Sequence, residues 1–192
     1  MCGRYYVDDE TVNEIEKIAR QVSEKFSYKG DVYPTNKVPI IHNSQDSLVS
    51  SMMAWGFPNY AKKGVIINAR SETVKEKRTF SKPIMESRCI VPATGFYEWD
   101  SSKNKIRFER KDTSILYMAG IWKRYEDEDR FVILTTDANE SMKDIHDRMP
   151  LILENSELEN WIFDNKFTDY ILHKTPTQLK KIREYEQEKL SL

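Results

Sequence analysis

A series of short segments rich in apolar, β-branched and aromatic residues runs through the middle of the chain, and it constrains the fold more than any other feature. Each segment is bounded by glycine, proline, asparagine or charged residues, as strands usually are. The expected strands are residues 47–55, 65–68, 106–110, 116–122, 131–136 and 151–153, with two more on either side of a bend within 88–99. No long helical stretch separates them, and parallel neighbours would need crossovers of about a dozen residues. The pattern predicts an α+β fold whose strands pair mostly antiparallel.

Four segments have the spacing or the composition of helices. Asp8 is a cap candidate, and Val12, Ile15 and Ile18 recur at helical spacing, so residues 9–26 should form an amphipathic helix on the core. Further helices are expected at 138–145, 156–164 and 176–190, the last within a charged tail at about 176–192.

Length, composition and charge exclude several classes of protein. The 192 residues fit one domain, 1–192, and no apolar run approaches the roughly 20 residues of a membrane-spanning helix. No leader opens the chain and it has only two cysteines, so we expect a cytoplasmic protein without disulfides. Neither a zinc-type spacing nor a glycine-rich phosphate loop is present, so no metal and no cofactor is expected. A net charge of -1 gives no overall signal for nucleic acid.

The chain begins Met1-Cys2-Gly3-Arg4. Removal of Met1, which the small side chain behind it permits, would leave a cysteine with an α-amine and a thiol on adjacent carbons. The amine has a reference pKa of roughly 7.7 to 8.0, so part of it is unprotonated at neutral pH. Such a pair can form an imine with an aldehyde and then close a five-membered thiazolidine ring through sulfur. From these residues alone, Cys2 is more often just a small residue at a frayed chain end.

Two other residues suit proton transfer. Glu98 lies among aromatic residues in an expected strand, where partial loss of water would raise the pKa of its carboxyl group. His146 opens a polar loop, and an unperturbed imidazole pKa of about 6.5 suits proton transfer in both directions, while Arg148 could hold an anion. A single strand glutamate is more often solvent-facing and a lone histidine more often structural, so both interpretations of each residue stay open.

A basic stretch runs from Lys62 to Arg88. It holds eight basic and three acidic residues, an excess of five in a chain whose total charge is -1. The stretch could be a solvated face. It could also be a phosphate-binding edge, because the planar guanidinium of arginine fits phosphate oxygens and aromatic neighbours can stack on bases.

Four motifs then occur in order. They are Met-Cys-Gly-Arg at 1–4, Ile-Asn-Ala-Arg-Ser-Glu-Thr at 67–73, a segment from Arg-Cys through proline to Gly-Phe-Tyr-Glu-Trp at 88–99, and His-Asp-Arg-Met-Pro at 146–150. Over about residues 1–153 the chain closely resembles the SOS response-associated peptidase family. The resemblance implies a barrel-like β core flanked by helices, in a protein of the SOS and DNA-damage response that shields abasic sites in single-stranded DNA by cross-linking to them. Beyond residue 153 the resemblance fades, and Tyr60 stands where the family commonly has a second tryptophan.

The resemblance also implies roles for individual residues. Cys2 would be the nucleophile, Asn68 would hold the reacting sugar or amine, and Glu98 and His146 would transfer protons. The DNA-binding residues would be Arg4, Arg70, Arg78 and Arg148 for phosphates and Trp55 and Trp99 for bases. We expect the four catalytic residues to converge on one concave, positively charged face, with Cys2 accessible.

Three functions follow from these residues. The first is covalent capture of abasic sites in single-stranded DNA by a monomer at the nucleoid, with a lyase reaction if the ring does not close. The second is a peptidase or amidohydrolase, because a terminal cysteine beside a base can cleave amides, as the family name records. The third is a single-stranded DNA-binding module that is indifferent to Cys2 and to abasic sites.

Overall fold

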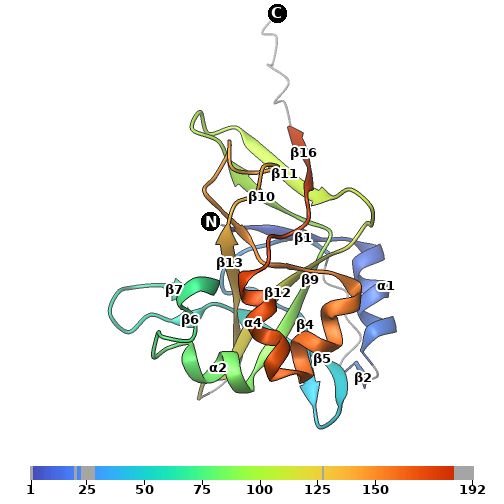
Figure 1. The fold of residues 1–192 in the computed structure, drawn as a ribbon, viewed down its shortest axis with the longest axis vertical. Coiled ribbons are helices and arrows are strands. Elements are labelled where there is room, and N and C mark those ends of the chain that lie inside the picture. Colours follow the sequence, from blue (N-terminus) through green and yellow to red (C-terminus); the bar gives the residue numbers. More distant parts are fainter. Residues whose placement is uncertain (1, 20, 23–28, 127, 184–192) are drawn as a thin grey trace, which may run out of the picture.

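The computed structural model describes residues 2–19, 21–22, 29–126 and 128–183. Its centre is a closed but uneven ring of five strands (Figure 1), namely β4 (Lys37–Ser44), β5 (Ser47–Trp55), β9 (Arg88–Ala93), β12 (Leu116–Arg124) and β13 (Asp129–Asp137). The pairs β4–β5, β4–β9, β9–β12 and β12–β13 are antiparallel, and a parallel pairing of β13 with β5 closes the ring. The predicted α+β fold with a mostly antiparallel, barrel-like core is therefore confirmed.

Shorter strands extend this ring. β2 (Gln21–Val22) pairs with β5, β8 (Asn68–Arg70) and β14 (Arg148–Pro150) pair with β13, and β15 (Ile152–Leu153) pairs with β12. A separate two-stranded sheet joins β6 (Phe57–Pro58) to β7 (Val65–Ile66). Because β8 and β14 both lie along β13, segments about 80 residues apart in the sequence meet at one end of the ring.

A second sheet lies over that end, in the order β16-β11-β10-β1-β3. Its strands are β1 (Tyr5–Val7), β3 (Gly30–Val32), β10 (Gly95–Trp99), β11 (Lys105–Arg110) and β16 (Leu179–Arg183). Figure 1 shows β10, β11 and β16 rising above the ring. Only Thr94 separates β9 from β10, so one stretch of chain leads from the ring to the strand that carries Glu98.

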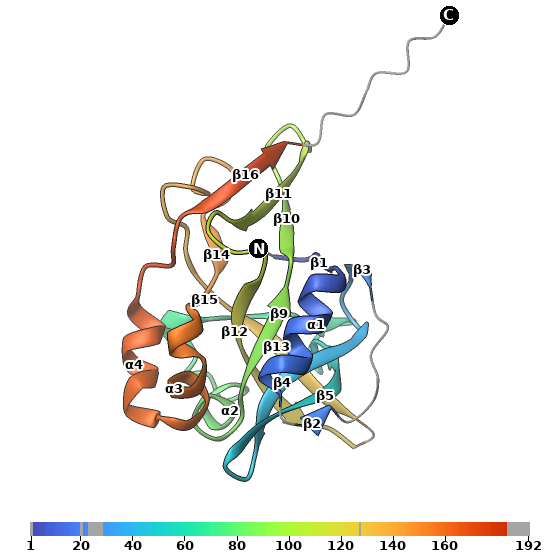
Figure 2. The ribbon, with the colours of Figure 1, turned by 90° about the vertical axis from the view of Figure 1, so that its right-hand side faces the viewer.

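The ring strands separate two apolar cores, because alternate residues point to opposite faces. One core contains Ile40, Met53, Val91 and Ile133 from the ring, together with Cys2. The other contains the intervening positions and most of the buried apolar residues of the helices. Figure 2 shows the ring strands between α1 on one side and α3 and α4 on the other.

The helices are α1 (Asp9–Ile18), α2 (Ser81–Glu86), α3 (Leu158–Phe163) and α4 (Asn165–His173), with 3-10 turns at Ser71–Thr73 and Asn155–Glu157. α1 begins as predicted, since the Asp8 side chain accepts a hydrogen bond from the Thr11 N–H. The prediction that it continues to residue 26 is wrong, because Ala19 is extended and Gln21–Val22 pair with β5 instead. The helix predicted at 156–164 is confirmed, whereas α4 was not predicted.

Two other helix predictions fail where side chains or distant strands compete with the local pattern. Residues 138–145 form turns rather than a helix, because the Asn139 side chain accepts hydrogen bonds from the backbone N–H and the hydroxyl of Ser141. Within the segment predicted as a helix at 176–190, Leu179–Arg183 is strand β16, which pairs along all of its length with β11. Residues 184–192 lie outside the described part of the chain.

Candidate active site

The leading residues run as an extension of β1 beside β10. Tyr5 pairs with Phe96, and the Tyr97 N–H donates to the carbonyl oxygen of Arg4 at 3.0 Å. Extending the same antiparallel register toward the start of the chain places Gly3 opposite Glu98, and Cys2 is the residue before Gly3. The second sheet therefore brings the start of the chain to the strand that carries the candidate proton-transfer carboxylate.

Cys2 is fully buried, which corrects the expectation of an accessible thiol. Its side chain packs in the core that the inward-facing ring residues form, and its thiol makes a long 3.8 Å contact with the carbonyl oxygen of Arg4. Burial raises the pKa of the Cys2 thiol far above its usual range, and the charge of Glu98 raises this pKa further. The thiol is thus protonated at neutral pH and lies within the electrostatic reach of Glu98.

Asn68 reaches Cys2 from the other side. It begins β8, opposite Ile133 of β13, and its Nδ2 donates a 3.0 Å hydrogen bond to the carbonyl oxygen of Cys2. Its Oδ1 is buried and has no hydrogen-bond partner among the described residues. Buried polar atoms are nearly always paired, so an unpaired oxygen beside Cys2 is a suitable acceptor for a bound group. The structure therefore brings together Cys2, Asn68 and Glu98.

His146 ends the turns that follow β13. Its Nδ1 accepts a 2.9 Å hydrogen bond from the backbone N–H of Arg148. The Asp147 Oδ1 also lies 2.8 Å from Nδ1, a contact that would need a proton on that nitrogen. The backbone N–H always carries its hydrogen, whereas the Asp147 side chain is 84% exposed and free to turn, so we assign Nδ1 as the acceptor. A neutral His146 then carries its proton on Nε2.

Arg148 is a structural residue in this fold, which corrects its expected role as a phosphate ligand. It is buried, and its guanidinium donates to both carboxylate oxygens of Glu72 at 2.8 Å, to Asp137 at 2.5 Å and to the carbonyl oxygen of Thr135 at 2.7 Å. These bonds join β14 to β13 and to the turn after β8. Because Glu72 and Asp137 balance the charge of Arg148 and its terminal N–H groups donate within the protein, this residue is a poor candidate for binding a phosphate.

Trp55 is likewise a core residue and not a platform for DNA bases. It is fully buried, its ring stacks on Phe131 and tilts on Tyr5, and its indole N–H donates to the carbonyl oxygen of Ile67 at 3.0 Å. Tryptophan side chains carry a large apolar area that favours such burial.

Trp99 and Arg4 lie together near the start of the chain. The Arg4 guanidinium is 5.1 Å from the Trp99 ring and 4.5 Å from the ring of Tyr33, and it pairs with Asp31 at 3.6 Å. Tyr33 was not predicted as part of this group, because a proline-bounded loop residue gives no sequence signal of the contact. Cation–π contacts of this kind hold an arginine in place while its charge stays available at the surface.

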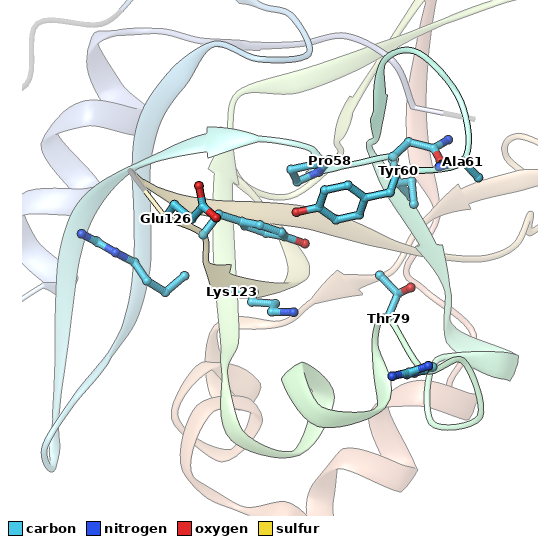
Figure 3. Close-up of a pocket in the computed structure, with 11 residues that line it drawn as sticks. Pro58, Tyr60, Ala61, Thr79, Lys123 and Glu126 are labelled. Atoms are coloured by element: carbon cyan, nitrogen blue, oxygen red, sulfur yellow. The ribbon is translucent and has the colours of Figure 1, made fainter.

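Arg70 and Arg78 are both exposed. Arg70 lies two residues after Asn68 on β8, so the two side chains leave the same face of that strand. Arg78 lines a separate open pocket of about 680 Å³ (Figure 3), with aromatic and basic neighbours that include Tyr60, Lys123 and Tyr125. Of the four predicted arginines, Arg70 and Arg78 are thus exposed, and Arg4 is partly exposed beside Asp31.

In the part of the chain that the structure describes, no group of three or more histidine, cysteine or acidic side chains could hold a metal ion. None of the described helices is long and apolar enough to cross a membrane.

A barrel-like β fold that places Cys2 between Asn68 and Glu98 defines a class of protein. Comparisons with known proteins identify that class. A family model described as SOS response associated peptidase (SRAP) matches residues 1–191. The chain belongs to this family.

Individual relatives agree with this assignment. Abasic site processing protein YoaM of Bacillus subtilis (strain 168) is 34% identical over 196 residues, covering 89% of this chain and 83% of its own. Abasic site processing protein YedK of Escherichia coli (strain K12) is 28% identical over 176 residues, covering 84% and 79%. A solved structure from Bacteroides thetaiotaomicron matches with a TM-score of 0.80 at 27% identity, covering 95% of this chain and 91% of the other.

Proposed function

We propose that this protein captures abasic sites in single-stranded DNA through the α-amine and thiol of Cys2 after Met1 is removed. The observation that carries the proposal is the position of Cys2 between two of the predicted residues. Asn68 donates a hydrogen bond to the carbonyl oxygen of Cys2, and the charge of Glu98 raises the pKa of the Cys2 thiol. Membership of a family whose relatives include abasic site processing proteins supports the substrate.

The reaction needs no external oxidant or reductant. A ring-opened abasic sugar presents an aldehyde at C1′, and the unprotonated amine adds to that carbon to form a carbinolamine. Loss of water gives an imine. The sulfur then bonds to C1′ while the thiol proton passes to nitrogen, which closes the thiazolidine with one water released overall. Each step moves a proton, and we propose that Glu98 and His146 accept and return these protons.

The buried thiol sets the order of these steps. For as long as Cys2 stays enclosed, its raised pKa keeps the thiol protonated at neutral pH, so the thiol is a poor first nucleophile and the amine attacks first. A peptidase reaction would instead begin with attack by the thiolate, so the same raised pKa disfavours that alternative. Where sulfur does not close the ring, the imine allows β-elimination at the sugar, which would be a lyase reaction.

Burial of Cys2 adds a requirement. We propose that removal of Met1, or entry of the DNA, opens the packing around Cys2. Alkylation by a small thiol reagent measures this directly. Protein without Met1 should react at Cys2 faster than protein that retains Met1, while the buried internal Cys89 stays unreactive in both.

Phosphate contacts would come from the arginines that the fold leaves available. Arg70 is exposed on the strand that carries Asn68, and Arg4 is held beside Trp99 near Cys2. The Trp99 ring, which is only partly buried, would contact a base next to the lesion, where the missing base removes stacking. Arg78 would hold the backbone farther along the strand.

A gel assay tests the proposal. Protein shown by mass spectrometry to lack Met1 is incubated with a uracil-containing oligonucleotide after uracil removal. We expect a shifted band that survives heating, is absent from Cys2→Ala and persists in Cys89→Ala, the matched control for loss of a buried thiol. Absence of the band from processed wild-type protein would refute the proposal, and a band that persists in Cys2→Ala would refute the role of Cys2.

A further inference from the structure

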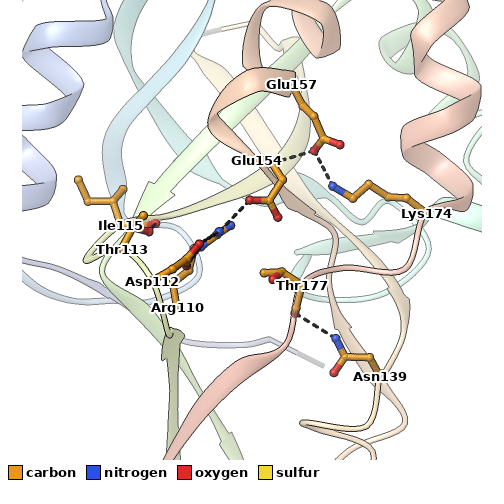
Figure 4. A network of polar contacts seen from close by, with 9 residues as sticks. All are labelled: Arg110, Asp112, Thr113, Ile115, Asn139, Glu154, Glu157, Lys174 and Thr177. Atoms are coloured by element: carbon orange, nitrogen blue, oxygen red, sulfur yellow. Dashed lines mark hydrogen bonds and ion pairs between the residues drawn. The ribbon is translucent and has the colours of Figure 1, made fainter.

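The C-terminal strand β16 is tied to the loop that carries His146. Asn139 is buried in that loop, and its Nδ2 donates to the carbonyl oxygens of Pro176 at 2.8 Å and Thr177 at 3.0 Å. Figure 4 shows the Asn139 amide directed at the segment that enters β16. Both amide protons of Asn139 are thus used on backbone acceptors more than 35 residues away in the sequence.

The amide oxygen of Asn139 holds the loop itself. It accepts hydrogen bonds from the backbone N–H of Ser141 at 2.9 Å and from the Ser141 hydroxyl at 2.6 Å. The same hydroxyl oxygen accepts from the Leu179 N–H of β16 at 3.0 Å. An ion pair also joins Lys181 to Asp144 at 2.5 Å. The loop therefore has three polar anchors on β16 and the segment before it, made by Asn139, Ser141 and Asp144.

Backbone hydrogen bonds connect Asn139 to His146. The Met142 N–H donates to the Asn139 carbonyl oxygen at 3.0 Å, and the His146 N–H donates to the Met142 carbonyl oxygen at 3.1 Å. The Ala138 N–H closes the loop on the carbonyl oxygen of Asp147 at 2.9 Å. His146 then receives the Arg148 N–H at Nδ1. Hydrogen bonds thus lead from the segment that enters β16 through Asn139 and Met142 to the backbone N–H of His146.

We infer that Asn139 is a positioning residue that keeps the proton of neutral His146 on Nε2, and that β16 is part of its support. The role needs an amide, because Nδ2 must donate twice while Oδ1 accepts twice. An aspartate would place a carboxylate oxygen against two carbonyl oxygens. The role of His146 in the reaction rests on the proposed function. The assignment of its tautomer rests only on the hydrogen bond from the Arg148 N–H.

Nitrogen NMR of the imidazoles tests the inference without DNA. The chain has three histidines, so a His146→Gln variant assigns the signals. We expect the Nε2-protonated form in the wild type above the pH at which the ring is charged, and a mixture of the two tautomers in Asn139→Ala and Asn139→Asp. Thr168→Val is the matched control, because it removes a buried hydroxyl bond to the Asp164 carbonyl far from the loop and should leave the His146 signals unchanged.

Cross-linking rates give the second readout. At saturating DNA we expect Asn139→Ala to react about 10- to 100-fold more slowly than Thr168→Val, since small misplacement of a catalytic group has effects of this size. Affinity for an oligonucleotide without a lesion should not change. If Asn139→Ala does not fold, Ser141→Ala, which breaks one anchor only, replaces it and should shift the tautomers in the same direction.

Wild-type His146 signals in a folded Asn139→Ala or Ser141→Ala protein would overturn the inference. Loss of cross-linking in wild-type protein would overturn the proposed function but leave the tautomer comparison intact, so the two failures are distinguishable.

Discussion

Replacement of Arg148 by methionine separates a structural role from a DNA-binding role. The change keeps an apolar stem but removes all hydrogen bonds of the guanidinium. The buried carbonyl oxygen of Thr135 loses its donor, which costs about 1–3 kcal/mol. Glu72 and Asp137 are 40% and 88% exposed and regain water, so their pairs contribute little more than about 1 kcal/mol together. We expect the free energy of unfolding to fall by about 2–4 kcal/mol.

Two assays measure this prediction. Urea unfolding followed by tryptophan fluorescence gives the loss of stability, and a thermal scan should show the midpoint lower by roughly 4–16 °C. Binding to a lesion-free single strand is then measured against salt concentration in conditions where both proteins are folded. One phosphate contact contributes about 0.7 to the slope of log affinity against log salt. Arg148→Met should leave this slope unchanged.

Arg70→Met is the matched control, because Arg70 is exposed on β8. It should change stability by no more than about 0.5 kcal/mol and reduce the salt slope by about 0.7. The reasoning is refuted if Arg148→Met is as stable as the wild type and lowers the salt slope, because Arg148 would then be the phosphate ligand.

Three further predictions concern stability. Trp55→Ala should lower the free energy of unfolding by about 3–5 kcal/mol in urea titrations, because a fully buried ring is lost; a neutral effect would mean that Trp55 is not a core residue. Burial alone would raise the pKa of Glu72, but hydrogen bonds from Arg148 prevail and lower it below its usual 4.5. Glu72 therefore contributes stability that is present above pH about 4.5 and is lost as pH falls through the lowered pKa, so Glu72→Gln should lose less stability across this acid range than the wild type. Gly95→Ala should destabilise by about 1–3 kcal/mol in the same titrations, since a Cβ there would lie 2.5 Å from the carbonyl oxygen of Phe108; an unchanged midpoint would contradict the close packing of β10 on β11.

Four of the five ring strands, together with β10, could be predicted from the sequence because the features that define them are local. Alternating apolar residues and the bend at Thr94-Gly95 lie within a few positions of each other, so β5, β9, β10, β12 and β13 appear close to where they were expected. The failed helices have the opposite cause. Residues 179–183 have helical composition, but their backbone pairs with β11, which is more than 65 residues earlier. The helix expected at 138–145 is replaced by turns because the Asn139 side chain accepts two hydrogen bonds from Ser141 and donates two to the distant residues Pro176 and Thr177.

The sequence alone determined the chemistry available to this protein, namely a cysteine directly after Met1, an asparagine, a glutamate and a histidine in motifs that identify the family. Only the tertiary structure decided which of these groups meet, because the β1–β10 ladder and the Asn68 amide act across 66 or more residues. It also decided what is accessible. Trp55 and Arg148 are buried by neighbours from other strands, and Cys2 is enclosed by a core that no stretch of four residues could reveal. Side-chain identity is a local property, whereas burial and partnership depend on the whole chain.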